Sequence, residues 1–207
     1  MKISHWIGRE FVTLSSEGKP VLTASEEAKE IFGRFGEELQ SLDLSLENTV
    51  RTQLWAKDRE SRDLGSKERI KILSGKARSA SSSYIAPDHF DSDAHVALDL
   101  LAMRPRQQGI QKFLKEYDPP VTPLRYLTCD TIVFLSGVSS GLIDFDDQVA
   151  DILSLISDSL ADSTTSWDRA VKVSFFLHRS QKLETLKGLF KKVVQAEIPH
   201  TEYVFVD

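Results

Sequence analysis

The sequence predicts an α+β protein built from two similar β-β-α-β-α-β repeats, in which helices pack on one face of each sheet. The first observation is that one pattern occurs twice. Residues 45–58 and residues 166–179 both alternate apolar and polar side chains, which is typical of a strand with one buried face. The second observation is a common register, because Val171 lies 121 residues after Val50 (171 − 50). An internal repeat at a fixed spacing predicts that the same structural unit is built twice.

The same spacing relates other segments of the two halves. It places residues 133–137 on residues 12–16, and Phe176 on Trp55. It also aligns apolar residues of two amphipathic helical stretches, namely Phe32 with Leu153, Phe35 with Ile156, and Leu39 with Leu160. Both halves are therefore expected to share the order of their elements.

The first half is expected to open with two short strands and to end with an additional one. The expected elements are two strands within residues 3–15, a helix capped by Thr23 or Ser25, a strand at 49–57, a loop at 58–65, a helix at 66–74, and strands at 77–84 and 96–103. Glu26 and Glu27 would lie in the first turn of the first helix, where negative charge suits the helix dipole. Gly75 is expected to end the second helix.

The second half is expected to repeat this order without the last strand. The expected elements are a strand at 131–136, a helix after Asp144, a strand at 170–178, a helix at 182–195 and a strand at 201–206. Four prolines (Pro105, Pro119, Pro120 and Pro123) mark the join between the halves. We therefore expect a first domain at residues 1–104, a linker at 105–122, and a second domain at 123–207 that lacks its last strand.

Composition limits the classes of function. The 207 residues carry a net charge of −5, which argues against a nucleic-acid surface. Cys129 is the single cysteine, and the five histidines form no helical pair that would indicate a metal site. No segment resembles a membrane span, and the N-terminus lacks the apolar core of a signal peptide. We expect a cytoplasmic protein with no metal, no membrane partner and no nucleic-acid partner.

Three short motifs, at residues 45–58, 77–79 (Ala-Arg-Ser) and 136–137 (Ser-Gly), resemble in their order and spacing the Rid family, also called YjgF or reactive-intermediate deaminases. The resemblance covers nearly the whole chain. It implies a chorismate-mutase-like fold, assembly into threefold rings, and sites in clefts between neighbouring domains. Members of the family hydrolyse enamines and imines to a keto acid and ammonia without a cofactor. The resemblance thus implies a cofactor-independent hydrolase acting on a small substrate that carries a carboxylate.

The resemblance also implies which residues form the site. Arg78 matches the family's arginine, whose planar fork holds the substrate carboxylate. The family's water-positioning glutamate falls on Ala97, while Asp99 points the same way one step along the strand and is the candidate catalytic residue. Tyr84, on the strand after Arg78, and Tyr126, in a place that resembles the family's early Gly-Pro-Tyr, are further candidates for substrate binding.

Each candidate also has a purely structural explanation. Arg78 could be a salt-bridged surface residue, Asp99 could make a structural hydrogen bond, and Tyr84 could belong to an ordinary polar strand face. In the second half Thr201 replaces the arginine. The alternative hypothesis is therefore a catalytically silent binding or assembly module.

Two aromatic residues predict self-association. Trp55 and Phe176 alternate with the residues expected to face the helices, so a lone half would expose both to water on the opposite face of its sheet. Because two domains cannot close a three-membered ring, other chains must contribute. A homotrimer is the simplest closed assembly.

Overall fold

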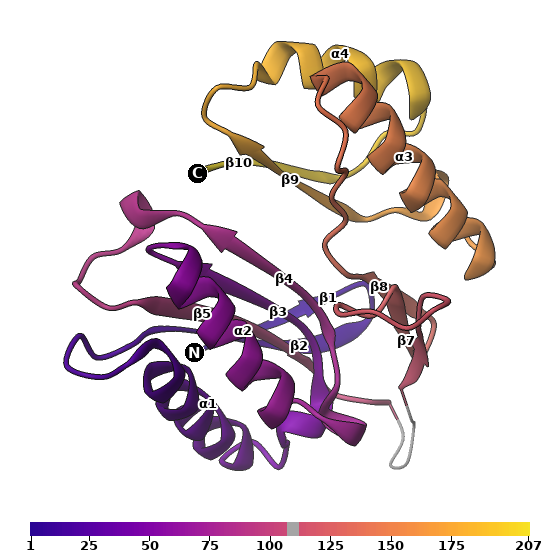
Figure 1. Cartoon of the computed structure of the whole chain (residues 1–207). Helices are drawn as coiled ribbons and strands as arrows, with labels where there is room; N and C mark the ends of the chain where they lie inside the picture. The colour runs from indigo at the N-terminus through magenta and orange to yellow at the C-terminus, as the bar shows by residue number, and fades with distance from the viewer. Residues whose placement is uncertain (107–111) are drawn as a thin grey trace. The chain divides into compact units, whose positions relative to one another are not determined.

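The computed structural model describes residues 1–106 and 112–207, which divide into two compact units, Met1–Gly137 and Val138–Asp207 (Figure 1). The strands of the first unit are β1 (Lys2–Trp6), β2 (Arg9–Glu17), β3 (Thr49–Ala56), β4 (Ala80–Ile85), β5 (Val96–Met103), β6 (Phe113–Lys115), β7 (Tyr126–Cys129) and β8 (Ile132–Leu135), and its helices are α1 (Ala24–Gln40) and α2 (Arg59–Ile72). The second unit contains α3 (Phe145–Asp162), β9 (Lys172–His178), α4 (Leu183–Val193) and β10 (His200–Val206).

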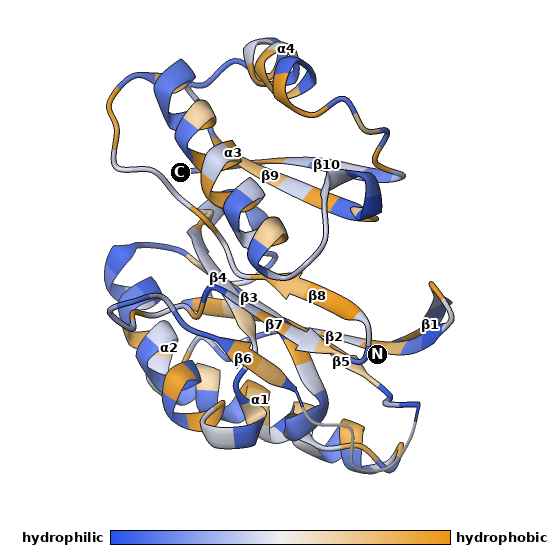
Figure 2. Cartoon of the chain, turned by 90° about the vertical axis from the view of Figure 1, so that its right-hand side faces the viewer, coloured by the Kyte–Doolittle hydropathy of each residue, from blue (hydrophilic) through white to orange (hydrophobic). Residues whose placement is uncertain are grey.

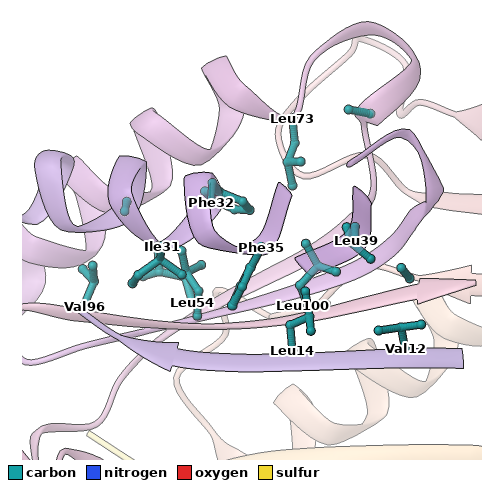
Figure 3. Packing of buried hydrophobic residues seen from close by; sticks show 14 of the residues in the cluster. Val12, Leu14, Ile31, Phe32, Phe35, Leu39, Leu54, Leu73, Val96 and Leu100 are labelled. Atoms are coloured by element: carbon teal, nitrogen blue, oxygen red, sulfur yellow. The ribbon is translucent and has the colours of Figure 1, made fainter. Parts of the chain in front are cut away.

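Five strands of the first unit form one sheet in the order β1-β2-β5-β3-β4. β5 lies at its centre and pairs antiparallel with both β2 and β3, whereas β3 and β4 run parallel. Helices α1 and α2 cover one face of this sheet (Figure 1). Successive strand side chains point to opposite faces, so Leu54, Leu98 and Leu100 all lie in the core beneath the helices. Figure 3 shows Leu54 and Leu100 packed beside Ile31 and Phe35 of α1.

A smaller antiparallel sheet, β6-β7-β8, covers part of the opposite face. The two sheets share a second apolar cluster, whose buried members are Phe11, Val50, Ala80, Met103, Leu124, Leu127 and Cys129. Figure 2 shows β6 and β8 as largely hydrophobic strands. Burial of apolar surface on both faces of the large sheet therefore stabilises the first unit.

A buried ion pair also joins these two sheets. Arg9 Nε donates to Asp130 Oδ2 at 2.8 Å, and both side chains are only 4% exposed. Arg9 opens β2, and Asp130 lies in the turn between β7 and β8, 121 residues later. A buried charge without a partner is strongly destabilising, so each residue requires the other.

The second unit has a two-stranded parallel sheet, β9-β10, with α3 and α4 on one face (Figure 1). The buried apolar residues of its core are Val149, Leu153, Leu177 and Leu186. Phe175 of β9 packs against Phe190 of α4 and Tyr203 of β10, with ring centroids 4.9 and 5.5 Å away. The strand side that the alternation pattern predicts to face helices therefore does so in this unit too.

The spacing of 121 residues recurs in the backbone of both units. The pairs that keep it are the capping residues Thr23 of α1 and Asp144 of α3, the left-handed residues Asp43 (φ 55°) and Thr164 (φ 57°), and the 3₁₀ helices Leu46–Asn48 and Trp167–Arg169. Helices and strands of the two halves follow in the same order. The predicted two-repeat α+β fold, with helices on one face of each sheet, is confirmed.

Helix α2 begins earlier than the sequence predicts. The prediction has a loop at residues 58–65 and a helix from Ser66, whereas α2 begins at Arg59. Asp58 is its N-cap and accepts a hydrogen bond from the backbone N–H of Ser61 at 2.8 Å. The prediction of a loop is wrong because charged residues dominate this stretch and hide the helical periodicity. The cap supplies the missing start signal.

The compact units differ from the predicted division into domains. That division has a linker at residues 105–122 and a second domain from residue 123. In the structure β6 lies within the predicted linker, and the hairpin β7-β8 belongs to the first unit. Residues 107–111 of the predicted linker lie outside the described residues. Repeats and compact units do not coincide, because this hairpin buries its apolar residues against the first sheet.

Two glycines test the packing of the helices on the sheet. A Cβ atom at Gly65 of α2 would lie 2.9 Å from Leu54 Cδ1 and 3.0 Å from Val96 Cγ1, both buried. We expect Gly65→Ala to lower the free energy of unfolding, because overpacking costs about 1–3 kcal/mol and exceeds the gain of about 1 kcal/mol in helix propensity. Gly33→Ala in α1 is the matched control.

A Cβ atom at Gly33 would meet no atom within 4 Å. Gly33→Ala should therefore raise the free energy of unfolding by about 0.5–1 kcal/mol. Urea denaturation of both variants measures the difference. The opposite order of stabilities would show that α2 does not lie against the sheet at Gly65.

Candidate functional site

Arg78 lines a hollow of about 280 Å³ in the first unit. The hollow lies at the start of β4, next to the C-terminal end of α2 and to residues 122–124. Its polar lining includes the side chains of Arg69, Arg78, Thr52, Ser79 and Ser81. Arg78 follows the 3₁₀ turn Gly75–Ala77, which places it where β4 begins.

A second arginine contributes to the same hollow. Arg69 of α2 is 5% exposed; its Nη1 donates to the carbonyl oxygen of Ser82 at 2.7 Å and its Nη2 to Ser83 Oγ at 2.8 Å. Burial lowers the pKa of Arg69 to about 10, so the guanidinium stays charged at neutral pH. Arg69 thus places a positive charge among the residues that line this hollow, which favours an anion.

Arg78 is paired with a carboxylate of the chain itself. Its Nη1 donates to Glu116 Oε1 in an ion pair. Within the described residues, the other oxygen of Glu116, Oε2, is buried and has no hydrogen-bond partner. An unsatisfied buried acceptor costs about 1–3 kcal/mol, so this oxygen still lacks the hydrogen bond that would offset its burial.

Lys112 holds the segment that carries Glu116. Its Nζ donates to the carbonyl oxygens of Thr49 at 2.8 Å and Arg78 at 2.7 Å. Burial lowers the pKa of Lys112 to about 8. The ammonium group therefore fastens residues 112–116 to the starts of β3 and β4.

Asp99 lines a different hollow, of about 500 Å³, with Ser15, Trp55 and His89. Its two carboxylate oxygens accept hydrogen bonds from Ser15 Oγ at 2.6 Å and Trp55 Nε1 at 2.7 Å. The Trp55 ring lies against Tyr84 and His89, with centroids 5.4 and 5.3 Å away. Burial raises the pKa of Tyr84. This arrangement is an aromatic cluster with a hydrogen-bonded carboxylate on the sheet face away from the helices.

The structure brings together only some of the predicted site residues. Arg78 and Asp99 line separate hollows, although the sequence predicts that they act together. Tyr84 lies beside Trp55 near Asp99. Tyr126 is 3% exposed in β7 and lines neither hollow. Thr201 is exposed on β10 of the second unit.

Sequence reasoning missed Arg69, Lys112 and Glu116. Arg69 lies within the predicted helix at residues 66–74, but no local pattern shows that its side chain reaches β4. Lys112 and Glu116 lie in the predicted linker, where no motif marks them. The proline-rich context gave no indication that this segment returns to the sheet.

Within residues 1–106 and 112–207, no three His, Cys, Asp or Glu side chains gather in an arrangement that could hold a metal ion. None of the helices in the described part of the chain is long and apolar enough to cross a membrane.

No protein-family model matches the sequence, and no curated protein matches it. Among solved structures, a chorismatase matches at a TM-score of 0.66 and 12% identity, over 100% of this chain and 75% of that chain. A member of the highly conserved YjgF/YER057c/UK114 family from Mycobacterium tuberculosis matches at a TM-score of 0.41 and 16% identity, over 46% of this chain and 79% of that chain. Yeast Mmf1 matches at a TM-score of 0.39 and 17% identity, over 46% of this chain and 84% of that chain. The whole-chain match fits the tandem YjgF-like fold predicted from the sequence.

The buried position of Lys112 predicts a dependence of stability on pH. With a pKa of about 8 in the folded chain against an ordinary value of 10.5, the unfolded chain binds more protons between these two values. The free energy of unfolding should therefore rise with pH between about 8 and 10.5 more steeply in the parent than in Lys112→Met. The difference in slope should reach at most about 1.4 kcal/mol per pH unit.

Chemical denaturation at a series of pH values measures this slope. Lys71→Met is the control, because Lys71 is exposed on α2 and pairs with Glu68. Identical pH profiles for the parent and Lys112→Met would show that the ammonium group is not buried.

Proposed function

We propose that the first unit of this tandem YjgF-like chain binds a small carboxylate-bearing compound at Arg78 and hydrolyses it without a cofactor. The observation that carries the proposal is the hollow of about 280 Å³ that both Arg78 and Arg69 line. Guanidinium groups bind carboxylates through two parallel hydrogen bonds, and partial burial strengthens that interaction. This supports the arginine-anchor hypothesis over that of a surface arginine.

The presence of two arginines favours a substrate with one or two carboxylates. An imine or enamine derived from an amino acid carries one, and chorismate carries two. The whole-chain structural match is to a chorismatase, which makes chorismate a compound to test. The likeness at 12% identity concerns the fold, so the proposal commits only to the chemical class of the substrate.

Glu116 is the residue we assign to the water molecule. In the proposed step, Glu116 Oε2 accepts a proton from water as the water oxygen attacks the carbon of the C=N bond. On a protonated C=N bond this addition gives a carbinolamine, and the proton then passes from Glu116 to the nitrogen. The C–N bond breaks and ammonia leaves, while the hydroxyl of the carbinolamine gives its proton back to Glu116 as the C=O bond of the keto acid forms. A positioned carboxylate of this kind contributes about 10²–10⁴-fold to a rate. We assign no part in this step to Asp99, because it lines the other hollow, whereas Glu116 is paired with Arg78 of this one.

The Arg78–Glu116 ion pair also supports the second hypothesis, that of a silent binding module. A carboxylate of the chain already occupies one donor of the arginine. If Glu116 served only to neutralise Arg78, the hollow would bind ligands without changing them. The two hypotheses differ in what removal of the Glu116 charge does to turnover.

Arg78→Ala should weaken carboxylate binding by about 10- to 100-fold, because a hydrogen bond to a charged group contributes about 1.5–3 kcal/mol. Binding is measured by calorimetry with chorismate and with stable keto acids. Turnover of imines is measured as ammonia release, with the imines generated in the assay by an amino-acid oxidase. Turnover of chorismate is measured as its loss from the assay. The control is Arg62→Ala, since Arg62 is an arginine of α2 that pairs with Asp63 outside the hollow.

Glu116→Gln should preserve binding and lower turnover by about 100-fold or more. Turnover by Arg78→Ala equal to that of the parent would remove Arg78 from the site. Binding by the parent without turnover of any compound would favour the silent module.

Self-association remains a proposal as well. Trp55 is half-buried within the first unit, where its indole N–H donates to Asp99, and Phe176 is half-buried on β9. We propose that the remaining aromatic surface is covered in a homotrimer. Light scattering should then give about three times the chain mass of 23.3 kDa. A stable monomer at low micromolar concentration would contradict it.

A further inference from the structure

We propose that the hydroxyl groups of Thr52, Ser79 and Ser81 bind a hydroxyl group of the substrate, so that the hollow selects hydroxylated carboxylates over their alkyl analogues. These three residues line the same hollow of about 280 Å³ as Arg78 and Arg69. The inference rests on the proposed function, because it adds a second point of recognition to the carboxylate held by Arg78.

The register of the sheet brings the three hydroxyl groups together. Thr52 of β3 lies directly opposite Ser81 of β4. Ser79 comes two residues before Ser81, so their side chains point to the same face, and Ser79 Oγ lies 3.5 Å from Thr52 Oγ1. Leu54, two residues after Thr52, lies in the core beneath the helices. The three hydroxyl groups therefore form one patch on the helix side of the sheet, which we call the hydroxyl patch.

The hydroxyl patch is buried but poorly hydrogen-bonded. Thr52, Ser79 and Ser81 are 1%, 8% and 9% exposed. Within residues 1–106 and 112–207, the hydroxyls of Thr52 and Ser79 bond only to each other, well beyond the usual O–H···O distance of about 2.7–2.8 Å. In the same part of the chain Ser81 uses its backbone N–H but not its hydroxyl in a hydrogen bond. Burial of such groups is unfavourable until a partner satisfies them.

The next serine in the same row shows how the chain satisfies a hydroxyl that it does not leave for a ligand. Ser83 Oγ lies 2.9 Å from Ser66 Oγ and accepts a hydrogen bond from Arg69 Nη2 at 2.8 Å. Ser83 does not line the hollow. Protein groups thus bind the hydroxyl outside the hollow, whereas the hydroxyls that line it keep hydrogen-bonding capacity.

The backbone holds Ser81 in a fixed position. Its N–H donates to Ser136 Oγ at 3.2 Å, and its carbonyl oxygen accepts from the Gly137 N–H at 3.0 Å. Strand pairing with Thr52 fixes the other side of the residue. A group held in this way loses little conformational freedom when it binds a ligand.

A hydroxyl group fits the hydroxyl patch better than a methyl group or a second carboxylate. The patch offers both donors and acceptors, and a ligand hydroxyl can use both, whereas a carboxylate only accepts. A methyl group would leave buried hydroxyls unpaired. Leu73, Pro123 and Leu124 supply an apolar lining for the carbon chain between the two polar groups of the ligand. These features define the substrate class as small hydroxylated carboxylates.

The test compares pairs of keto acids that differ only in having a hydroxyl or a methyl group at the end of the chain. One pair is 3-hydroxypyruvate with 2-oxobutanoate, and a longer pair is 4-hydroxy-2-oxobutanoate with 2-oxopentanoate. Calorimetry with the full chain should give about 3- to 10-fold tighter binding of the hydroxylated member in at least one pair.

Thr52→Val and Ser81→Ala should each abolish this preference by weakening the binding of the hydroxylated member. The ratio of affinities within a pair is the readout, because a disturbed fold would weaken both members. Ser66→Ala is the matched control, since it removes a hydroxyl that contacts Ser83 outside the hollow, and it should keep the preference.

Two results would overturn the inference while Arg78→Ala still weakens binding, so that the proposed function stands. They are equal affinities within both pairs, and a preference that Thr52→Val and Ser81→Ala retain. Tighter binding of 2-oxoglutarate than of both hydroxylated keto acids would also overturn it, because the second group would then be a carboxylate. If no keto acid binds, or if Arg78→Ala binds them as the parent does, the proposed function itself fails and the inference fails with it.

Discussion

The double pairing of β5 is the constraint on which the first unit depends. This strand makes antiparallel ladders with β2 on one side and β3 on the other, so it alone connects the β1-β2 hairpin to β3 and β4. Its inward side chains, among them Val96, Leu98 and Leu100, form the floor on which α1 packs. Within the described residues no such strand lies between their counterparts β8 and β9, which belong to separate sheets. One strand therefore decides whether a repeat closes into a single sheet.

The separation of β8 from β9 has a consequence for the candidate site. The hairpin β7-β8 buries its apolar side chains on the far face of the first sheet, and the segment before it returns to the starts of β3 and β4. Lys112 fastens that segment through two backbone carbonyl oxygens, which brings Glu116 to Arg78. The ion pair at the hollow thus depends on a tertiary arrangement of the second repeat's first hairpin. Asp99, on the same face, is held instead by Ser15 and Trp55.

How far the sequence predicts this structure depends on the range of the interactions involved. Alternation and helical periodicity locate β3, β5, α1, α3 and β9, because one buried face leaves its period in the chain. The start of α2 is not predicted, because the side of this helix that faces the sheet buries Ser61, Gly65 and Arg69 rather than large apolar residues. Arg78 is predicted as a site residue because a short motif surrounds it. Glu116 is not found, because its role comes from a contact 38 residues away along the chain that no local pattern records.

The two repeats have kept different properties of a common unit. Capping residues, left-handed residues and 3₁₀ turns recur at the same spacing, because each is set by a few neighbouring backbone groups. Burial does not recur: Leu153 is as well buried as Phe32, but Ile152 and Ile156 are less buried than Ile31 and Phe35. Ala24 is buried as well, whereas its equivalent Phe145 is only partly buried, so the loss occurs at several positions along the helix. Local backbone geometry can survive the absence of a neighbouring strand, whereas a complete core cannot. The second unit therefore keeps the local backbone geometry of the repeat, with a less complete core within the described residues.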